Sequence, residues 1–261
     1  MSAATIELGG AASADAGRDV RPGLGRLTRV ELRKMTDTRA GFWLLLGTGA
    51  LVALVVLITC LTGDPPDKTF RELFSNGVQA ASFLLPILGI LLATSEWSQR
   101  TGLVTFALVP DRLRVMTAKL LAGLVLAGVA LVLCLLVAAI GTIVSAPDVP
   151  NQWTLPIGFF GQLVFYTAVG MITGVAFGAA FLASAPAIVA SFLLPIAFGA
   201  LGEINALDKT FDWLDTGRTL TDLADHLASA TEWGRVGTSL ALWMLLPLAI
   251  GFWRIVRSEI R

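Results

Sequence analysis

The sequence predicts an all-α integral membrane protein with six transmembrane helices, preceded by an amphipathic helix at the cytoplasmic surface. Three observations predict this class. Apolar residues make up 55% of the chain and charged residues only 15%, whereas about a quarter of the residues in a typical soluble domain are charged. The mean hydropathy is +0.76. Several uncharged stretches also reach about 20 residues, the length that crosses a bilayer core as a helix.

The first 40 residues divide into two parts. Residues 1–23 are rich in Ala, Gly, Ser and Asp and hold no apolar signal-peptide core, so we expect a disordered, uncleaved cytoplasmic tail. The segment 24–40 mixes basic and apolar side chains. This mixture is typical of a helix lying on an anionic membrane surface, and also of a basic flank that orients the first span. Thr28 followed by Glu31 predicts a capping box at the start of this helix.

The remaining residues, 41–261, form one predicted transmembrane domain. Its first uncharged stretch has about 22 residues, enough at 1.5 Å per residue to cross roughly 30 Å of hydrocarbon. No charge occurs between 155 and 202, which is too long for one span, and Ser184-Ala185-Pro186 is the predicted turn between two spans. The six predicted spans are 41–62, 77–94, 115–144, 155–183, 186–202 and 236–256.

A polar loop at 95–114 joins the second and third predicted spans. Glu96 and Arg100 are four residues apart, so on a helix they share a face in the favourable order for an ion pair. Pro110 has no backbone N–H and ends the short apolar piece before it. Asp111 is the expected N-cap of the following helix. We therefore expect a helical stub of roughly two turns outside the bilayer.

The second half of the chain contains a glycine stripe. Gly170, Gly174 and Gly178 recur every four residues, which places three positions without side chains on one line where another helix can approach closely. We interpret this stripe as a packing surface and not as a pore. Further on, 203–235 is the predicted extracellular segment between the last two spans, and Thr219 is the expected cap of a short helix within it.

The basic residues are distributed unequally about the spans. Fourteen lie in the N-terminal tail and first helix, in the loop 95–114 with Lys119 after it, and at the C-terminus. By the positive-inside rule, both termini and this loop are expected on the cytoplasmic side of the cell membrane. The other five basic residues are Lys68, Arg71, Lys209, Arg218 and Arg235.

Several kinds of chemistry lack their sequence motifs. No G-x-x-x-x-G-K-[ST] phosphate loop and no H-E-x-x-H zinc motif occurs, and the single histidine leaves no Ser-His or Cys-His arrangement with a plausible position. We therefore expect no catalytic residue, metal site, bound cofactor or nucleic-acid partner. The interiors of the predicted spans carry no ionisable residue, which argues against ion-coupled transport. Five polar residues in the spans are compatible with a substrate path or with bonds between helices: Gln79, Gln162, Tyr166, Thr173 and Ser191.

The order of these parts resembles the type-2 ATP-binding-cassette (ABC) transporter permeases, the six-helix membrane subunits of exporters. The resemblance covers nearly the whole chain after the tail. Glu31, Lys34 and Arg39 match the E-x-x-K-x-x-x-x-R pattern of the family's interfacial helix. The loop 95–114 resembles the family's coupling loop, although its turn reads Arg-Thr-Gly where basic-Gly-Thr is usual. The matching residues are Glu96, Arg100, Thr101, Gly102, Pro110, Arg112 and Lys119.

The resemblance implies a non-catalytic permease subunit that exports a hydrophobic or amphipathic substrate, as in multidrug efflux. The loop 95–114 would then form a coupling helix in a groove of a separate ABC ATPase subunit, which binds ATP and Mg. A second permease copy or a related permease would complete the path among the membrane lipids, and 203–235 would belong to the outer gate. A hypothesis of another class is an ATP-independent membrane scaffold or assembly protein whose loop binds a different cytoplasmic partner.

Overall fold

A computed structural model describes residues 23–98, 111–202 and 208–257, and these residues form helices and the turns between them. The elements are α1 (Leu24–Asp37), α2 (Arg39–Thr62), the 3-10 turn η1 (Pro65–Lys68), α3 (Phe70–Ser98), α5 (Arg112–Ser145), α6 (Ile157–Phe181), α7 (Ser184–Gly202), α8 (Asp208–Leu214), α9 (Thr216–Asp225), α10 (Ala230–Leu240), the π-helical turn η2 (Ala241–Leu245) and α11 (Leu246–Arg257). No strand occurs in these described ranges.

Five helical stretches of the described chain are long and apolar enough to cross a membrane. Four are α2, α3, α5 and α6, and the fifth is the continuous run Ala230–Ile255 through α10, η2 and α11. α7 is apolar but shorter. This composition is typical of a multi-pass all-α membrane protein. The fourth predicted span agrees within two residues with α6, whereas the second begins earlier and ends later than predicted, at Phe70 and Ser98.

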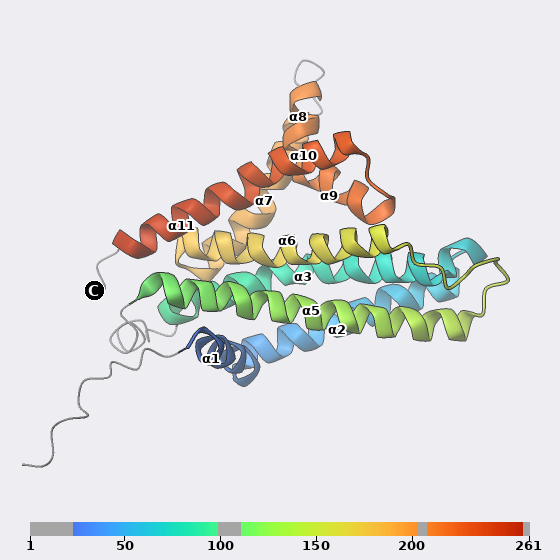
Figure 1. Ribbon diagram of the computed structural model, residues 1–261, viewed down its shortest axis with the longest axis horizontal. Coiled ribbons are helices and arrows are strands. Elements are labelled where there is room, and N and C mark those ends of the chain that lie inside the picture. Colours follow the sequence, from blue (N-terminus) through green and yellow to red (C-terminus); the bar gives the residue numbers. More distant parts are fainter. Residues whose placement is uncertain (1–22, 99–110, 203–207, 258–261) are drawn as a thin grey trace, which may run out of the picture.

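α3 lies at the centre of the bundle and packs against α2, α5 and α6. These four helices run lengthwise across Figure 1, with α11 packed on the other side of α6. α7 contacts both α3 and α6. As a result the C-terminal ends of α3, α6 and α11, the first turn of α5 and the helix α1 lie at one end of the molecule (Figure 1). We call this the α1 end.

α1 is a separate helix that crosses this end and is seen nearly along its axis in Figure 1. Thr38 is extended and separates α1 from α2, while its hydroxyl accepts a hydrogen bond from the amide of Gly41. Arg39 is therefore the first residue of α2 and does not belong to the interfacial helix. The predicted capping box is wrong, because α1 begins at Leu24 and Thr28 donates to the Leu24 carbonyl from inside the helix. The Glu31 carboxylate pairs with lysines instead.

Small residues let α3 and α6 approach each other closely. A Cβ added at Gly174 would collide with the backbone of Pro86 in α3, and one at Gly178 would lie 2.7 Å from the Cβ of Ala93. Both glycines therefore pack as predicted for a close helix contact. Gly170 does not, since an added Cβ there would meet nothing within 4 Å. The stripe drifts off the contact because a repeat of four residues exceeds the 3.6 residues of a helical turn.

Two predicted helix starts after α6 are also corrected. The turn between α6 and α7 lies at Leu182, which is left-handed (φ 57°), and α7 already begins at Ser184, so Pro186 lies in its first turn. α9 is capped by Asp215, whose carboxylate accepts from the amide of Gly217 at 2.8 Å, and not by Thr219. Proline is tolerated in a first turn, and a carboxylate is a strong capping acceptor.

Polar side chains from the long helices hold the last turn of α9 and the segment after it in place. Gln162 donates to the carbonyls of Leu223 and His226 and accepts from the amide of Ala228. Ser75 donates to the carbonyl of Ala224, and Gln79 to the carboxylate of Asp225 at 3.4 Å. For Gln79 and Gln162, the interpretation as bonds between helices is therefore supported by the contacts they make.

Candidate functional site

Four charged side chains meet at the α1 end of the bundle, and we call them the charge cluster: Glu31 and Lys34 of α1, Glu96 of α3 and Lys119 of α5. Glu96 and Lys119 are each 1% exposed and Glu31 is 4% exposed. Ionised groups are seldom buried this completely unless they are paired. The cluster is therefore the most distinctive polar feature of the described chain.

The cluster is a closed ring of alternating charge. Lys119 Nζ lies 2.7 Å from Glu31 Oε2 and 2.7 Å from Glu96 Oε2. Lys34 Nζ lies 2.6 Å from Glu31 Oε1 and 3.0 Å from Glu96 Oε1. Each carboxylate thus bridges both lysines and uses a different oxygen for each. Two acids and two bases leave the ring without net charge.

Neutral partners complete the coordination of Lys119. Its ammonium also donates to the Leu92 carbonyl at 2.7 Å and to the hydroxyl of Ser95 at 2.9 Å. Ser95 in turn donates to Glu96 Oε2 at 3.1 Å. The last two turns of α3 therefore bind Lys119 through a backbone carbonyl, a hydroxyl and a carboxylate. Since charge-assisted hydrogen bonds are the strong ones, these contacts hold α3 and α5 together at this end.

The local sequence explains how α1 reaches the cluster. Glu31 and Lys34 are three residues apart on α1 and lie on the face that also buries Met35, as helical spacing requires. Lys34 is the most exposed member, with 32% of its side chain accessible. Burial alone lowers the pKa of Lys34, but the carboxylates of Glu96 and Glu31 outweigh this effect and raise it. Lys34 therefore stays charged at physiological pH.

The cluster connects α1, α3 and α5. Its lysines and glutamates are all engaged with one another, and no group of three His, Cys, Asp or Glu in the described residues could hold a metal ion. Removing one partner of a buried pair leaves an uncompensated charge and typically costs about 3–5 kcal/mol. α1, α3 and α5 are therefore expected to move as one unit, because separating them would expose or orphan these charges.

The structure describes only some of the residues predicted for coupling. Arg100, Thr101, Gly102 and Pro110 lie outside the described residues, and so does the predicted Glu96–Arg100 pair. Glu96 contacts α1 and α5 instead of standing on an exposed turn.

The start of α5 is described. Asp111 is the N-cap of α5, as predicted, and accepts from the amide of Arg114 at 3.1 Å. Arg112 Nη1 donates to the Ile255 carbonyl of α11 at 2.7 Å.

Glu31, Lys34, Glu96 and Lys119 belong to three separate segments of the sequence, and their meeting in one cluster was not predicted. The sequence indicated the cluster only in part, because these four residues lie near the ends of apolar stretches and their charges sum to zero. Their separation along the chain, 62 positions between Lys34 and Glu96 and 88 between Glu31 and Lys119, hides the pairing. Only the packing of α1 and of α3 against α5 decides it.

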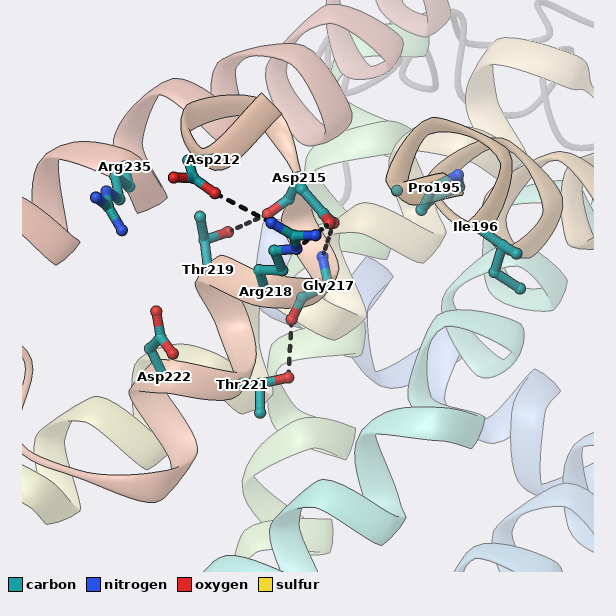
Figure 2. A pocket seen from close by; sticks show the side chains of 11 residues that line it. Pro195, Ile196, Asp212, Asp215, Gly217, Arg218, Thr219, Thr221, Asp222 and Arg235 are labelled. Atoms are coloured by element: carbon teal, nitrogen blue, oxygen red, sulfur yellow. Dashed lines mark hydrogen bonds and ion pairs between the residues drawn. The ribbon is translucent and has the colours of Figure 1, made fainter. Parts of the chain in front are cut away.

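A second polar site lies on the far side of α6, where a cavity of about 640 Å³ opens between α7, α8, α9 and α10. Figure 2 shows Arg218 between two carboxylates, at 3.1 Å from Asp212 and 3.5 Å from Asp215. Asp222 and Arg235 also line it. Arg218 is 43% exposed, so these pairs are solvated. Because Asp215 also caps α9, the ion pairs have a structural role in holding the short helices together.

Comparisons with protein-family models and with curated proteins find no match for this chain.

Proposed function

We propose that the chain is the permease subunit of an ATP-driven exporter, coupled to a separate ATPase subunit that binds ATP and Mg. The charge cluster is the observation that carries this proposal. It joins α1 to both helices that flank the loop 95–114, the end of α3 and the start of α5. A force applied to that loop by a soluble partner would therefore move three elements together as a rigid body.

The proposed topology has six spans with both termini in the cytoplasm. α7 would be the fifth span, since its 19 residues make about 28 Å of helix, close to the 30 Å bilayer core. Basic residues at the α1 end, including Arg39, Arg112 and Arg254, support placing that end in the cytoplasm by the positive-inside rule. The segment 203–235 would then face outward and form part of the outer gate.

The topology is tested by cysteine labelling in intact cells after Cys60 and Cys134 have been replaced. A cysteine at Ser98, at the end of α3, should be protected from an impermeant thiol reagent. A cysteine at Asp148, in the exposed turn between α5 and α6, should be labelled. Permeabilised cells give the control, because both positions should then react. Labelling of Ser98 alone in intact cells would reverse the orientation.

Assembly and coupling are tested on the complex purified from its native membrane. We expect the complex to contain two permeases and two ATPase subunits, each ATPase with a phosphate loop. The two permeases are either two copies of this chain or one copy with a related chain. A transport-active monomer would contradict the proposal, and isolation without any ATPase would favour the scaffold or assembly hypothesis.

A substitution in the charge cluster then separates coupling from folding. Glu96→Gln keeps the shape of the side chain and removes its charge, so we expect a folded complex whose ATPase rate no longer responds to substrate. Asp37→Asn is the matched control, because Asp37 pairs with Arg33 on the exposed face of α1, with side chains 64% and 83% accessible. Wild-type export by Glu96→Gln, with its ATPase still stimulated, would exclude a coupling role for Glu96.

A further inference from the structure

An apolar cavity of about 450 Å³ lies between α6, α7 and α11, apart from both polar sites. Its volume falls within the range of small-molecule sites, roughly 300–1,000 Å³. Residues from α6 and α7 and a long stretch of η2 and α11 line it, among them Ala180, Leu194, Leu242, Trp243, Leu246 and Arg254.

The walls of this cavity suit a hydrocarbon chain. Every lining side chain except Arg254 is apolar or aromatic. The one other polar atom, the indole N–H of Trp243, already donates to the Leu214 carbonyl at 2.8 Å. The lining extends from Leu242 to Arg254, which corresponds to about 18 Å along a helix at 1.5 Å per residue. The cavity is therefore an elongated apolar slot.

The slot opens at the surface of the helix bundle. Leu194 and Leu246 on its rim are 48% and 50% exposed. Part of its wall is the π-helical turn η2, which contributes Leu242 and Trp243. Single π-turns inside helices frequently occur at functional sites. Since α6 and the run Ala230–Ile255 beside it are long and apolar enough to cross a membrane, the opening faces the region that lipid chains occupy.

Arg254 gives the slot a charged end. Its Nη1 donates to the Ala180 carbonyl at the C-terminus of α6 at 2.5 Å, which fixes the guanidinium at the α1 end of the cavity. A guanidinium has four further N–H donors in a planar fork that matches a phosphate. Arg257 in the next turn of α11 is exposed, and Arg112 binds the neighbouring Ile255 carbonyl. The end of the slot is therefore strongly basic.

We propose that this cavity binds an anionic phospholipid, with one acyl chain in the slot and the phosphate on Arg254. Charge complementarity selects an anionic headgroup over a zwitterionic one, because basic residues next to a membrane helix each contribute attraction to anionic lipids. In the proposed topology the lipid belongs to the cytoplasmic leaflet. The bound lipid would brace α6, α7 and α11 against one another, since no single helix forms the slot.

The test uses the full chain, purified and delipidated in a mild detergent, with phosphatidylglycerol and phosphatidylcholine of identical acyl chains as probes. Native mass spectrometry counts the lipids bound and gives their dissociation constants. We expect phosphatidylglycerol to bind more tightly than phosphatidylcholine. Arg254→Gln should weaken phosphatidylglycerol about fivefold, the effect of one basic residue near a lipid surface, while Arg254→Lys should retain most of the affinity.

A matched pair of tryptophan variants tests the slot itself. Leu194→Trp places the ring in the cavity and should reduce binding of both lipids. Leu193→Trp adds the same bulk at the neighbouring residue, which is 57% exposed and does not line the cavity, and should leave binding unchanged. The proposal fails if the two lipids bind equally, or if both tryptophan variants behave alike. It also fails if Leu194→Trp changes the oligomeric mass without changing lipid binding, which would assign the slot to a partner chain. No ATPase partner is needed, so this result is independent of the proposed transport function.

Discussion

The charge cluster and the second polar site, which is formed by Arg218, Asp212 and Asp215 and which we call the Arg218 site, both pair basic with acidic side chains. They differ in how deeply these side chains are buried and in whether the pairs form a closed ring. In the cluster, two lysines and two glutamates form a ring whose central pair, Glu96 and Lys119, is 1% exposed. At the Arg218 site, one arginine lies between Asp212 and Asp215 and keeps 43% of its side chain in solvent. Exposed pairs contribute about 0–1 kcal/mol, whereas orphaning a buried charge costs several times more. Both sites connect helices, but the buried cluster is expected to hold α1, α3 and α5 together much more strongly than the solvated pairs of Arg218 hold α8 and α9.

Of the substitutions at the two sites, Lys119→Met is expected to lower the stability of the protein most. The variant leaves Glu31 and Glu96 buried with Lys34 as their shared counter-ion, so the free energy of unfolding should fall by about 3–5 kcal/mol. Denaturant unfolding in detergent, followed by tryptophan fluorescence, measures it. If expression of this variant fails, Lys34→Met provides a milder break, because Lys34 is partly solvated. A loss below about 1 kcal/mol would place the cluster in the same class as exposed pairs.

Gly174→Ala tests whether the close packing of α6 against α3, and not the charge cluster alone, positions α3. The added methyl would collide with the backbone of Pro86, so we expect a loss of about 1–3 kcal/mol, as for other overpacked cores. Gly170→Ala is the matched control, since its methyl would meet nothing within 4 Å. It should instead gain up to about 1 kcal/mol of helix propensity. Equal shifts in the midpoint of thermal unfolding for the two variants would contradict the α3–α6 packing.

Arg218→Gln should have the smallest effect. It removes two solvated ion pairs, so a loss of about 0–1 kcal/mol is expected, and the loss should shrink as salt is added. The same unfolding assay at low and high salt measures it, with Lys119→Met as the reference whose effect should persist because its partners are buried. A large, salt-independent loss for Arg218→Gln would mean that the cavity in Figure 2 is closed in the assembled protein.

Local features of the sequence determined the helical class, most of the long apolar helices and the cap at Asp111, because these depend on the composition and order of nearby residues. The predicted helix caps were wrong where another nearby group took the place of the predicted partner. Glu31 bonds lysines instead of the backbone near Thr28, and Asp215 precedes Thr219 as the cap of α9. The glycine repeat predicted a packing surface, but which glycines touch α3 depends on how the two helices cross.

Only the tertiary structure decided the charge cluster and the apolar slot. Glu31, Glu96 and Lys119 are far apart in the chain, and each taken alone is a charge near the end of an apolar stretch. Their pairing follows from the packing of α1 and of α3 against α5, which buries all three residues and brings both carboxylates to Lys119. The slot likewise depends on the spacing of α6, α7 and α11. Sequence determines local preference, whereas burial and the identity of distant partners are properties of the packed helices.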